Sequence, residues 1–214
     1  QLPRGGRHGA PRGAALRAAR LRGGASGEVQ LQPRPRLCAG RLGSAGAAGV
    51  VAARGFAMAA AARLGLGGGR ARAGAVYFGD SAEVAHALTA DVGALQSGLA
   101  FLPQLGTGTN SGEGLALAGQ LLERDGRRGV RHVVAIVTDG MPLSSYVMST
   151  AAKRLKSHGV RVVFVLVGPG LSKQAVKGWA SQPAEENLVK AQTYADLNQT
   201  KVTELLANLC PDFA

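Results

Sequence analysis

The chain has only two cysteines among its 214 residues, Cys38 and Cys210, which excludes a scaffold held together by several disulfides. Their spacing matches no metal-binding motif, and they are compatible with one disulfide in an oxidising compartment or with two free thiols. Long apolar runs are also missing, because no stretch reaches the roughly 18 residues that a transmembrane helix needs. The first 27 residues show no secretory signal pattern, since arginines interrupt every apolar run.

Acidic side chains are almost absent from the first 72 residues, which hold 13 arginines and one glutamate. The remaining 142 residues carry 12 basic and 12 acidic side chains, so the formal charge of +12 belongs to the N-terminal third alone. An Arg-Gly-rich segment can bind nucleic acid through phosphate contacts. However, residues 1–50 contain no Phe or Tyr that could stack on bases. Nucleic-acid binding through this basic tail is therefore kept only as an alternative function.

Aromatic and β-branched residues are scarce in residues 1–50. Such a segment cannot bury enough apolar surface to offset the entropy lost on ordering, so we expect it to be disordered. Residues 1–54 are accordingly interpreted as an Arg/Gly/Ala-rich disordered or mistranslated segment. Residues 55–212 are expected to form one domain, which is long enough to bury a sizeable core.

The pattern after Gly55 alternates strands with helices. Strands are predicted at Arg70–Phe78, Ala82–Leu88 (antiparallel), 131–138, Val160–Val167 and Asn187–Ala191. Helices are predicted at Phe56–Leu66, Asp91–Leu102, Gly112–Arg124, Ser145–His158, from Ser172 through Ala180, and Tyr194–Leu209. Thr89 and Ser172 are the predicted N-caps of the second and fifth of these, and Gly159 is expected to end the fourth. This order predicts an α/β fold, doubly wound, with a mostly parallel sheet and helices on both faces. Strands 71–78, 131–138 and 160–167 are expected to be adjacent in one sheet.

Arg131–Gly140 reads RHVVAIVTDG, an apolar run rich in β-branched residues that predicts a strand buried on both faces. It ends in Asp139-Gly140, at the edge where open α/β sheets bind their ligands. A second polar cluster, Gly106–Gly112 (GTGTNSG), stands directly before a predicted helix. Together the two segments indicate a metal or anion site at one edge of the sheet. The Asp-Gly pair by itself is equally compatible with a plain turn.

The succession GTGTNSGEGL, HVVAIVTDG and AAKRLKSHGVRVVFVLVG resembles the von Willebrand factor A domain. The stretch VKGWASQPAEENLVKAQTYADL is similar to the A domains of thrombospondin-related micronemal adhesins, and A domains of the collagen VI type are similar too. The resemblance runs from about Phe56 to Cys210. It implies a doubly wound fold with a metal-ion-dependent adhesion site (MIDAS), where a divalent cation, usually magnesium, binds an acidic side chain of a partner protein. It also implies an extracellular or cell-surface location and no enzymatic activity.

The resemblance assigns metal-ligand roles to two residues. The family's metal-loop threonine falls on Thr109, and its aspartate after the central strand falls on Asp139. Magnesium favours such hard oxygen ligands and keeps several waters. Asn110 or Ser111 could bond a metal-coordinated water, although simple loop capping is the plainer role for both. Gly140 is expected to let the backbone turn beneath the metal.

The sequence departs from the family where most metal ligands should lie. The family's first strand ends in Asp-x-Ser-x-Ser, and nothing like it precedes Phe56; Leu37–Gly49 contains no acid. Codons for residues 40–43, read one base later, can spell Val-Asp-Ser-Gly. The resemblance therefore implies a weak or absent magnesium site and a sheet that lacks its central first strand. Family A domains often bridge their ends, which here would join Cys38 to Cys210.

The alternative class is an α/β hydrolase-like enzyme. Against it, the sequence has no Gly-x-Ser-x-Gly elbow and no Gly-x-x-x-x-Gly-Lys phosphate loop. His86, His132 and His158 are expected at an edge strand, a strand start and a helix end, which are structural positions. We therefore expect a protein-binding or adhesion module.

Overall fold

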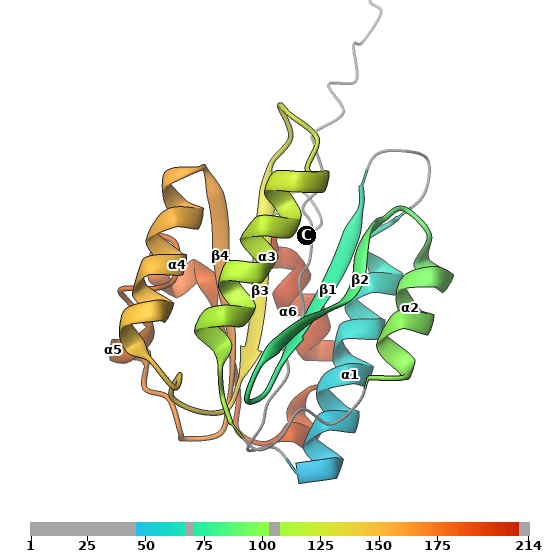
Figure 1. The fold of residues 1–214 in the computed structure, drawn as a ribbon. Coiled ribbons are helices and arrows are strands. Elements are labelled where there is room, and N and C mark those ends of the chain that lie inside the picture. The colour runs from blue at the N-terminus through green and yellow to red at the C-terminus, as the bar shows by residue number, and fades with distance from the viewer. Residues whose placement is uncertain (1–45, 67–70, 103–107, 210–214) are drawn as a thin grey trace, which may run out of the picture. The chain divides into compact units, whose positions relative to one another are not determined.

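The structure is a computed structural model that describes residues 46–66, 71–102 and 108–209, all within one compact unit. Its helices and strands alternate along most of the chain (Figure 1). The helices are α1 (Gly46–Arg63), α2 (Val92–Ala100), α3 (Ser111–Asp125), α4 (Ser145–Ser157), α5 (Lys173–Val176) and α6 (Gln199–Leu209), with short 3₁₀ helices η1 (Ala184–Asn187) and η2 (Tyr194–Asp196). The strands are β1 (Ala73–Phe78), β2 (Ala82–Thr89), β3 (His132–Thr138), β4 (Val160–Val167) and β5 (Leu188–Ala191). The predicted α/β class is confirmed.

The strands of the described residues form two sheets rather than one. β3, β4 and β5 are parallel, with His132 opposite Val160 and Thr138 opposite Leu166 at the two ends of the β3–β4 pair. β1 and β2 form a separate antiparallel pair. The prediction that 71–78 adjoins 131–138 and 160–167 in one sheet is therefore wrong for 71–78, while the other two strands are neighbours. No strand in the described part of the chain joins β1 to β3, as expected if the family's first strand is missing.

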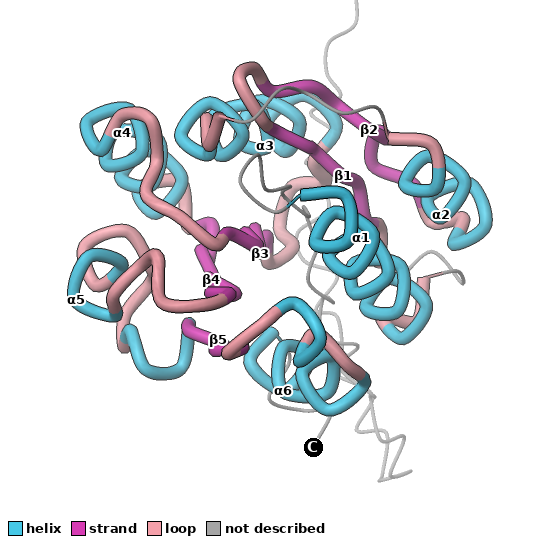
Figure 2. The backbone as a smooth tube through the Cα atoms, turned by 90° about the horizontal axis from the view of Figure 1, so that it is seen from below, coloured by secondary structure: helices cyan, strands magenta, loops and turns pink. Residues whose placement is uncertain are grey.

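The two sheets nevertheless share two hydrophobic cores. On one face, Ala73 and Ala75 of β1 lie in the same buried cluster as Val133 and Val137 of β3, beneath α1, α2 and α6. On the other face, Val76 and Phe78 of β1 and Val134 and Ile136 of β3 lie in a second buried cluster with residues of α3 and α4. Figure 2 shows α3 and α4 on the opposite side of β3 and β4 from α6. Alternating side chains of a strand point to opposite faces, so a fully apolar strand such as β3 serves both cores.

The first helix begins earlier than the sequence predicts. α1 starts at Gly46 rather than Phe56, so the expectation that residues 1–50 are disordered is wrong for residues 46–50. Alanine loses almost no side-chain entropy in a helix, and the Ala-rich stretch buries Phe56 and Ala60 against the first core. Our expectations for residues 1–45, including Cys38, and for Cys210 fall outside the described residues. No helix of the described residues is long and apolar enough to cross a membrane.

Capping residues explain where most of the other helices begin and end. Ser144 caps α4, and Gly159, at φ +72°, follows its last turn as predicted. Ser172 caps α5 as expected, but that helix ends at Val176. The predicted cap Thr89 is wrong: the Asp91 carboxylate accepts from the Ala94 amide at 3.0 Å, because it lies directly before the first turn.

Candidate functional site

Three loops meet at the edge of the sheets where β1 and β3 end (Figure 2). The amide of Asn110, directly before α3, donates to the carbonyl of Gly79, directly after β1, at 2.8 Å. The amide of Leu143, in the loop after β3, donates to the carbonyl of Thr109 at 3.0 Å. Residues 108–111 are therefore held between the β1–β2 turn and the β3–α4 loop. Thr109 and Asp139 lie in adjacent loops at this edge.

Hydroxyl groups are buried at the start of α3. The Thr109 side chain is 8% exposed and that of Ser111 is 1% exposed. The Ser111 hydroxyl has no hydrogen-bond partner among the described residues. A buried hydroxyl without a partner is costly, because folding removes the water to which it was bonded. The Ser111 hydroxyl is therefore free to bond a ligand at this edge.

Asp139 directly follows β3 and lies beside Tyr194 of η2. Burial, followed by a hydrogen-bonding interaction with the Asp139 carboxylate and its charge, raises the pKa of the Tyr194 hydroxyl above its ordinary value. The oxygen of that hydroxyl is buried. The Tyr194 side chain therefore lies on one side of the Asp139 carboxylate.

Gly140 and Thr138 close the turn after β3. The Thr138 hydroxyl, which is buried, donates to the carbonyl of Gly140 at 3.2 Å. Gly140 is not among the described glycines that adopt a positive φ, so backbone conformation alone does not require glycine there. The predicted role of Gly140 in turning the chain beneath a metal stays a prediction.

Asp80 is a site residue that sequence reasoning missed. Its carboxylate accepts a hydrogen bond from the amide of Gly108 at 2.6 Å, and its carbonyl accepts from the side chain of Asn110 at 3.2 Å. A methyl group added at Gly108 would lie 2.4 Å from that carboxylate, so the close approach requires glycine. Asn110 is the N-cap residue of α3 but makes no capping bond, and its amide braces the loop instead. In the sequence, Asp80-Ser81 indicates only a turn between two strands, and nothing signals that this turn meets the Gly-Thr loop.

The oxygen atoms at this edge are of the types that bind hard cations. Carboxylate and hydroxyl oxygens are the ligands that magnesium accepts, together with water. Within the described residues there is one carboxylate directly after β3 and no group of three or more His, Cys, Asp or Glu side chains able to hold a metal. A divalent cation here would therefore be held by Asp139, Thr109 and Ser111 with a large share of water, and weakly.

His132 and His158 each bond a nearby backbone carbonyl. His132 bonds the carbonyl of Arg127 at 3.2 Å, and His158 bonds the carbonyl of Arg154 at 2.8 Å. Both line a hollow of about 210 Å³ near the C-terminal ends of α3 and α4, where Glu123 is engaged by Arg154. No serine, threonine or cysteine is among the lining residues, so this hollow offers no nucleophile of that kind.

Comparison with known families gives one match over most of the chain. The sequence profile of the von Willebrand factor type A domain matches residues 43–203, which include Thr109, Asp139 and all the strands described above. The match begins at residue 43, within the stretch Leu37–Gly49 that contains no acid. Comparison with curated protein sequences finds no significant match.

Solved structures with the same fold include two metal-bearing proteins. Proximal thread matrix protein 1 from the mussel byssus has a TM-score of 0.74 and 17% identity, over 84% of this chain and 49% of that one. The same protein with a zinc-occupied MIDAS motif has a TM-score of 0.69 and 22% identity, over 84% of this chain and 46% of that one. Manganese-loaded TRAP of Plasmodium vivax has a TM-score of 0.66 and 20% identity, over 86% of this chain and 74% of that one. The chain thus spans about half the length of the thread matrix protein, and these likenesses show the fold.

Proposed function

Because the chain belongs to the von Willebrand factor type A domain family, we propose that it is a protein-binding adhesion module that uses a divalent cation to bind an acidic side chain of a partner protein. The cation lies at the edge formed by the loops after β1 and β3 and before α3. The observation that carries this proposal is the buried, unpartnered hydroxyl of Ser111, next to the buried Thr109, at the edge that also holds Asp139.

The proposed ligands have distinct roles. Asp139 supplies the negative charge, and the hydroxyls of Thr109 and Ser111 supply neutral oxygens. A bound cation would leave coordination positions open, and a carboxylate of the partner can replace water in one of them. The Asp80 carboxylate accepts from the Gly108 amide and the Asn110 side chain donates to the Asp80 carbonyl, so the proposed role of Asp80 and Asn110 is to hold the loop that presents the hydroxyls.

Magnesium is the proposed cation, and its binding is weak. One carboxylate and two hydroxyls leave about half of six octahedral positions to water. The zinc in the MIDAS motif of one structure named above and the manganese in another support a divalent metal. An extracellular or cell-surface location is proposed in line with a matrix protein of the mussel byssus among the similar structures. We propose no catalytic activity.

Thermal unfolding with and without cation tests the proposal. At 10 mM MgCl₂ and a dissociation constant of about 1 mM, linkage adds about 1.4 kcal/mol, or about 3–5 °C in the unfolding midpoint. Thr109→Val keeps the side-chain shape, removes the hydroxyl and should reduce this gain. Thr89→Val is the matched control, since the Thr89 hydroxyl bonds the Asp91 amide away from the site. An equal gain in all three chains would mean that the cation binds elsewhere.

The disulfide between Cys38 and Cys210 stays a prediction. Mass spectrometry of the unreduced protein decides it, because two alkylatable thiols would exclude the bridge.

The nucleic-acid alternative is tested by removing residues 1–45 and measuring RNA affinity at two salt concentrations. An affinity that depends on this segment and falls steeply with salt would favour the alternative.

A further inference from the structure

The parallel sheet of β3, β4 and β5 ends at β5, which pairs on one side only within the described residues. The amide of Gly168, directly after β4, donates to the carbonyl of Ala191 at 2.9 Å, so the main chain of Ala191 faces β4. The main-chain groups of successive strand residues point alternately to the two sides of a strand. Those of Leu188 and Lys190 therefore face away from β4. An edge of this kind can pair with an additional strand.

A hollow of about 250 Å³ lies along this edge, and its lining comes from β5, α5, η1 and α6. Leu188 of β5 lines it and packs against the core cluster that contains Val176 of α5. Val189 lies instead in the core cluster that contains residues of α6. Because side chains alternate along a strand, Lys190 points to the same face as Leu188, which is the face that α5 covers. The hollow thus reaches from the α5 face of the sheet to the α6 face, along the outer edge of β5.

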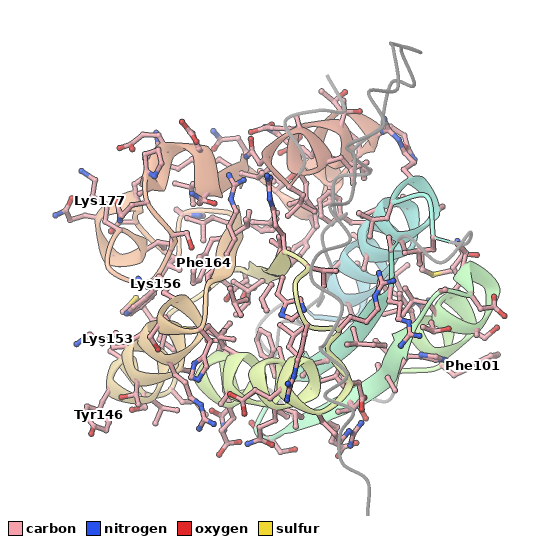
Figure 3. All side chains as sticks on the ribbon, turned by 90° about the horizontal axis from the view of Figure 1, so that it is seen from above. Phe101, Tyr146, Lys153, Lys156, Phe164 and Lys177 are labelled. Atoms are coloured by element: carbon pink, nitrogen blue, oxygen red, sulfur yellow. The ribbon has the colours of Figure 1, made fainter. Side chains whose placement is uncertain are left out.

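Three lysine side chains line the hollow: Lys173, Lys177 and Lys190. All three residues are exposed, and none of their ammonium groups makes an ion pair or a hydrogen bond to another described residue. Figure 3 shows the Lys177 side chain extending outward from α5. These three positive charges belong to the α5 side of the hollow, since Lys173 and Lys177 come from α5 and its C-terminal end.

Two acidic side chains also line the hollow, Glu185 of η1 and Glu204 of α6. The Glu204 carboxylate is already held by the ammonium group of Lys201 at 2.6 Å. Glu185 is left to offset three ammonium groups, so the hollow carries an excess of positive charge on its α5 side. An acidic group that enters there is attracted, and one that enters on the α6 side meets a neutral ion pair.

We propose that the outer edge of β5 binds an extended acidic segment of a partner protein, which adds to the sheet as a further strand. The main chain of the segment pairs with the outward-facing groups of Leu188 and Lys190. Its carboxylates, at alternate positions, face α5 and pair with the three lysines, while the positions between them face α6 and are uncharged. No divalent cation takes part, so this binding is independent of the proposed function.

The peptide Ac-Gly-Glu-Val-Glu-Val-Glu-Gly-NH₂ is the probe. It is titrated into the ¹⁵N-labelled full chain in EDTA at about 50 mM NaCl, where charge pairs at a surface are weakly screened. Hydrogen exchange of the Leu188 and Lys190 amides should slow at least about fivefold at saturation, because these amides become bonded. The Val189 amide, which faces β4, should change less. No binding at about 5 mM peptide, or unchanged exchange at Leu188 and Lys190, overturns the proposal.

Two N-methylated isomers of the peptide separate strand pairing from charge. One carries N-methyl groups on both Val residues, and the other carries them on the second and third Glu residues. One set of amides faces β5 and the other faces solvent, so one isomer should bind at least about tenfold more weakly than the parent and the other within about threefold of it. Equal binding by both isomers would show a polyanion without strand pairing, and loss by both would exclude an edge strand; either result overturns the proposal.

A pair of double variants tests the lysines. Lys173→Gln with Lys177→Gln should weaken binding of the parent peptide by about fivefold, as expected for two surface ion pairs. The matched control, Arg128→Gln with Lys153→Gln, removes the same net charge at exposed residues that do not line the hollow, and Lys153 extends outward from α4 (Figure 3). The control should change the affinity by less than about twofold. Equal weakening by the two double variants would mean that net charge alone attracts the peptide, and the proposed site would be wrong.

Discussion

Replacing Ser111 with alanine should stabilise the protein when no divalent cation is present. The Ser111 side chain is 1% exposed and its hydroxyl has no partner among the described residues. Leaving a hydroxyl unbonded in a buried position costs about 1–3 kcal/mol, and alanine removes that cost. Alanine is also a better helix former than serine, although position 111 is the first residue of α3 and gains little from this.

Ser111→Ala is expected to raise the free energy of unfolding by about 1 kcal/mol or more. The sign of this change shows whether the Ser111 hydroxyl lacks a partner. For a domain of this size 1 kcal/mol corresponds to about 2–4 °C in the unfolding midpoint. Addition of MgCl₂ should stabilise Ser111→Ala less than the original chain, because one proposed ligand is gone. The substitution is therefore expected to increase stability and to weaken cation binding at the same time, as residues kept for function often do.

A neighbouring serine provides the control. The Ser144 hydroxyl accepts from the amide of Val147 at 3.3 Å as the N-cap of α4. Ser144→Ala should cost about 1 kcal/mol, the opposite sign to Ser111→Ala. Chemical denaturation in EDTA, followed by circular dichroism, measures both. Destabilisation by Ser111→Ala would show that its hydroxyl is satisfied, and the reasoning for a cation ligand at that position would fail.

Other predictions concern packing and pH. Gly114→Ala should destabilise the protein by about 1 kcal/mol. The added methyl group would lie 2.6 Å from the buried ring of Phe78, and such overpacking costs about 1–3 kcal/mol. This cost exceeds the gain in helix propensity of about 1 kcal/mol. Gly119→Ala, on the same helix, meets only the end of a leucine at 3.1 Å and should be neutral or stabilising in the same denaturant titration; the reverse order of the two variants would contradict the packing of α3. Tyr194 has a raised pKa, so its contribution to stability is complete below the unfolded value of about 10 and is lost as pH rises further. Tyr194→Phe should therefore lose less stability than the original chain between pH 10 and 11, and an identical loss would mean that Tyr194 is not buried beside Asp139.

The elements with strong local signals could be predicted from the sequence. The run Val160–Val167 is apolar apart from Arg161 and rich in β-branched valine, and β4 has the same bounds. Ser172 was predicted as the cap of α5, and its side chain accepts from the amide of Ala175. Such features depend on a few neighbouring residues, which is why sequence alone predicts them.

Features that depend on distant contacts could not be predicted. The start of α1 is mostly Ala and Gly, with Val50 and Val51 as its β-branched residues, and this gives little sign of a core; yet Ala53 and Phe56 lie in a buried cluster with strand residues. The separation of β1 from β3 depends on what lies between them, and local pattern does not report it. The contacts of Asp80 with Gly108 and of Tyr194 with Asp139 join residues far apart in the chain.

Calorimetric titration with MgCl₂ tests most directly whether an incomplete cation site lies at this edge. Three chains are compared: the original, Asp139→Ala, and a double variant, Gly40→Asp with Leu42→Ser, which with the existing Ser44 writes Asp-x-Ser-x-Ser into residues 40–44. We expect a dissociation constant of about 1 mM for the original chain, no binding by Asp139→Ala, and at least about tenfold tighter binding by the double variant. Micromolar binding by the original chain that persists in Asp139→Ala would contradict a cation site built on Asp139.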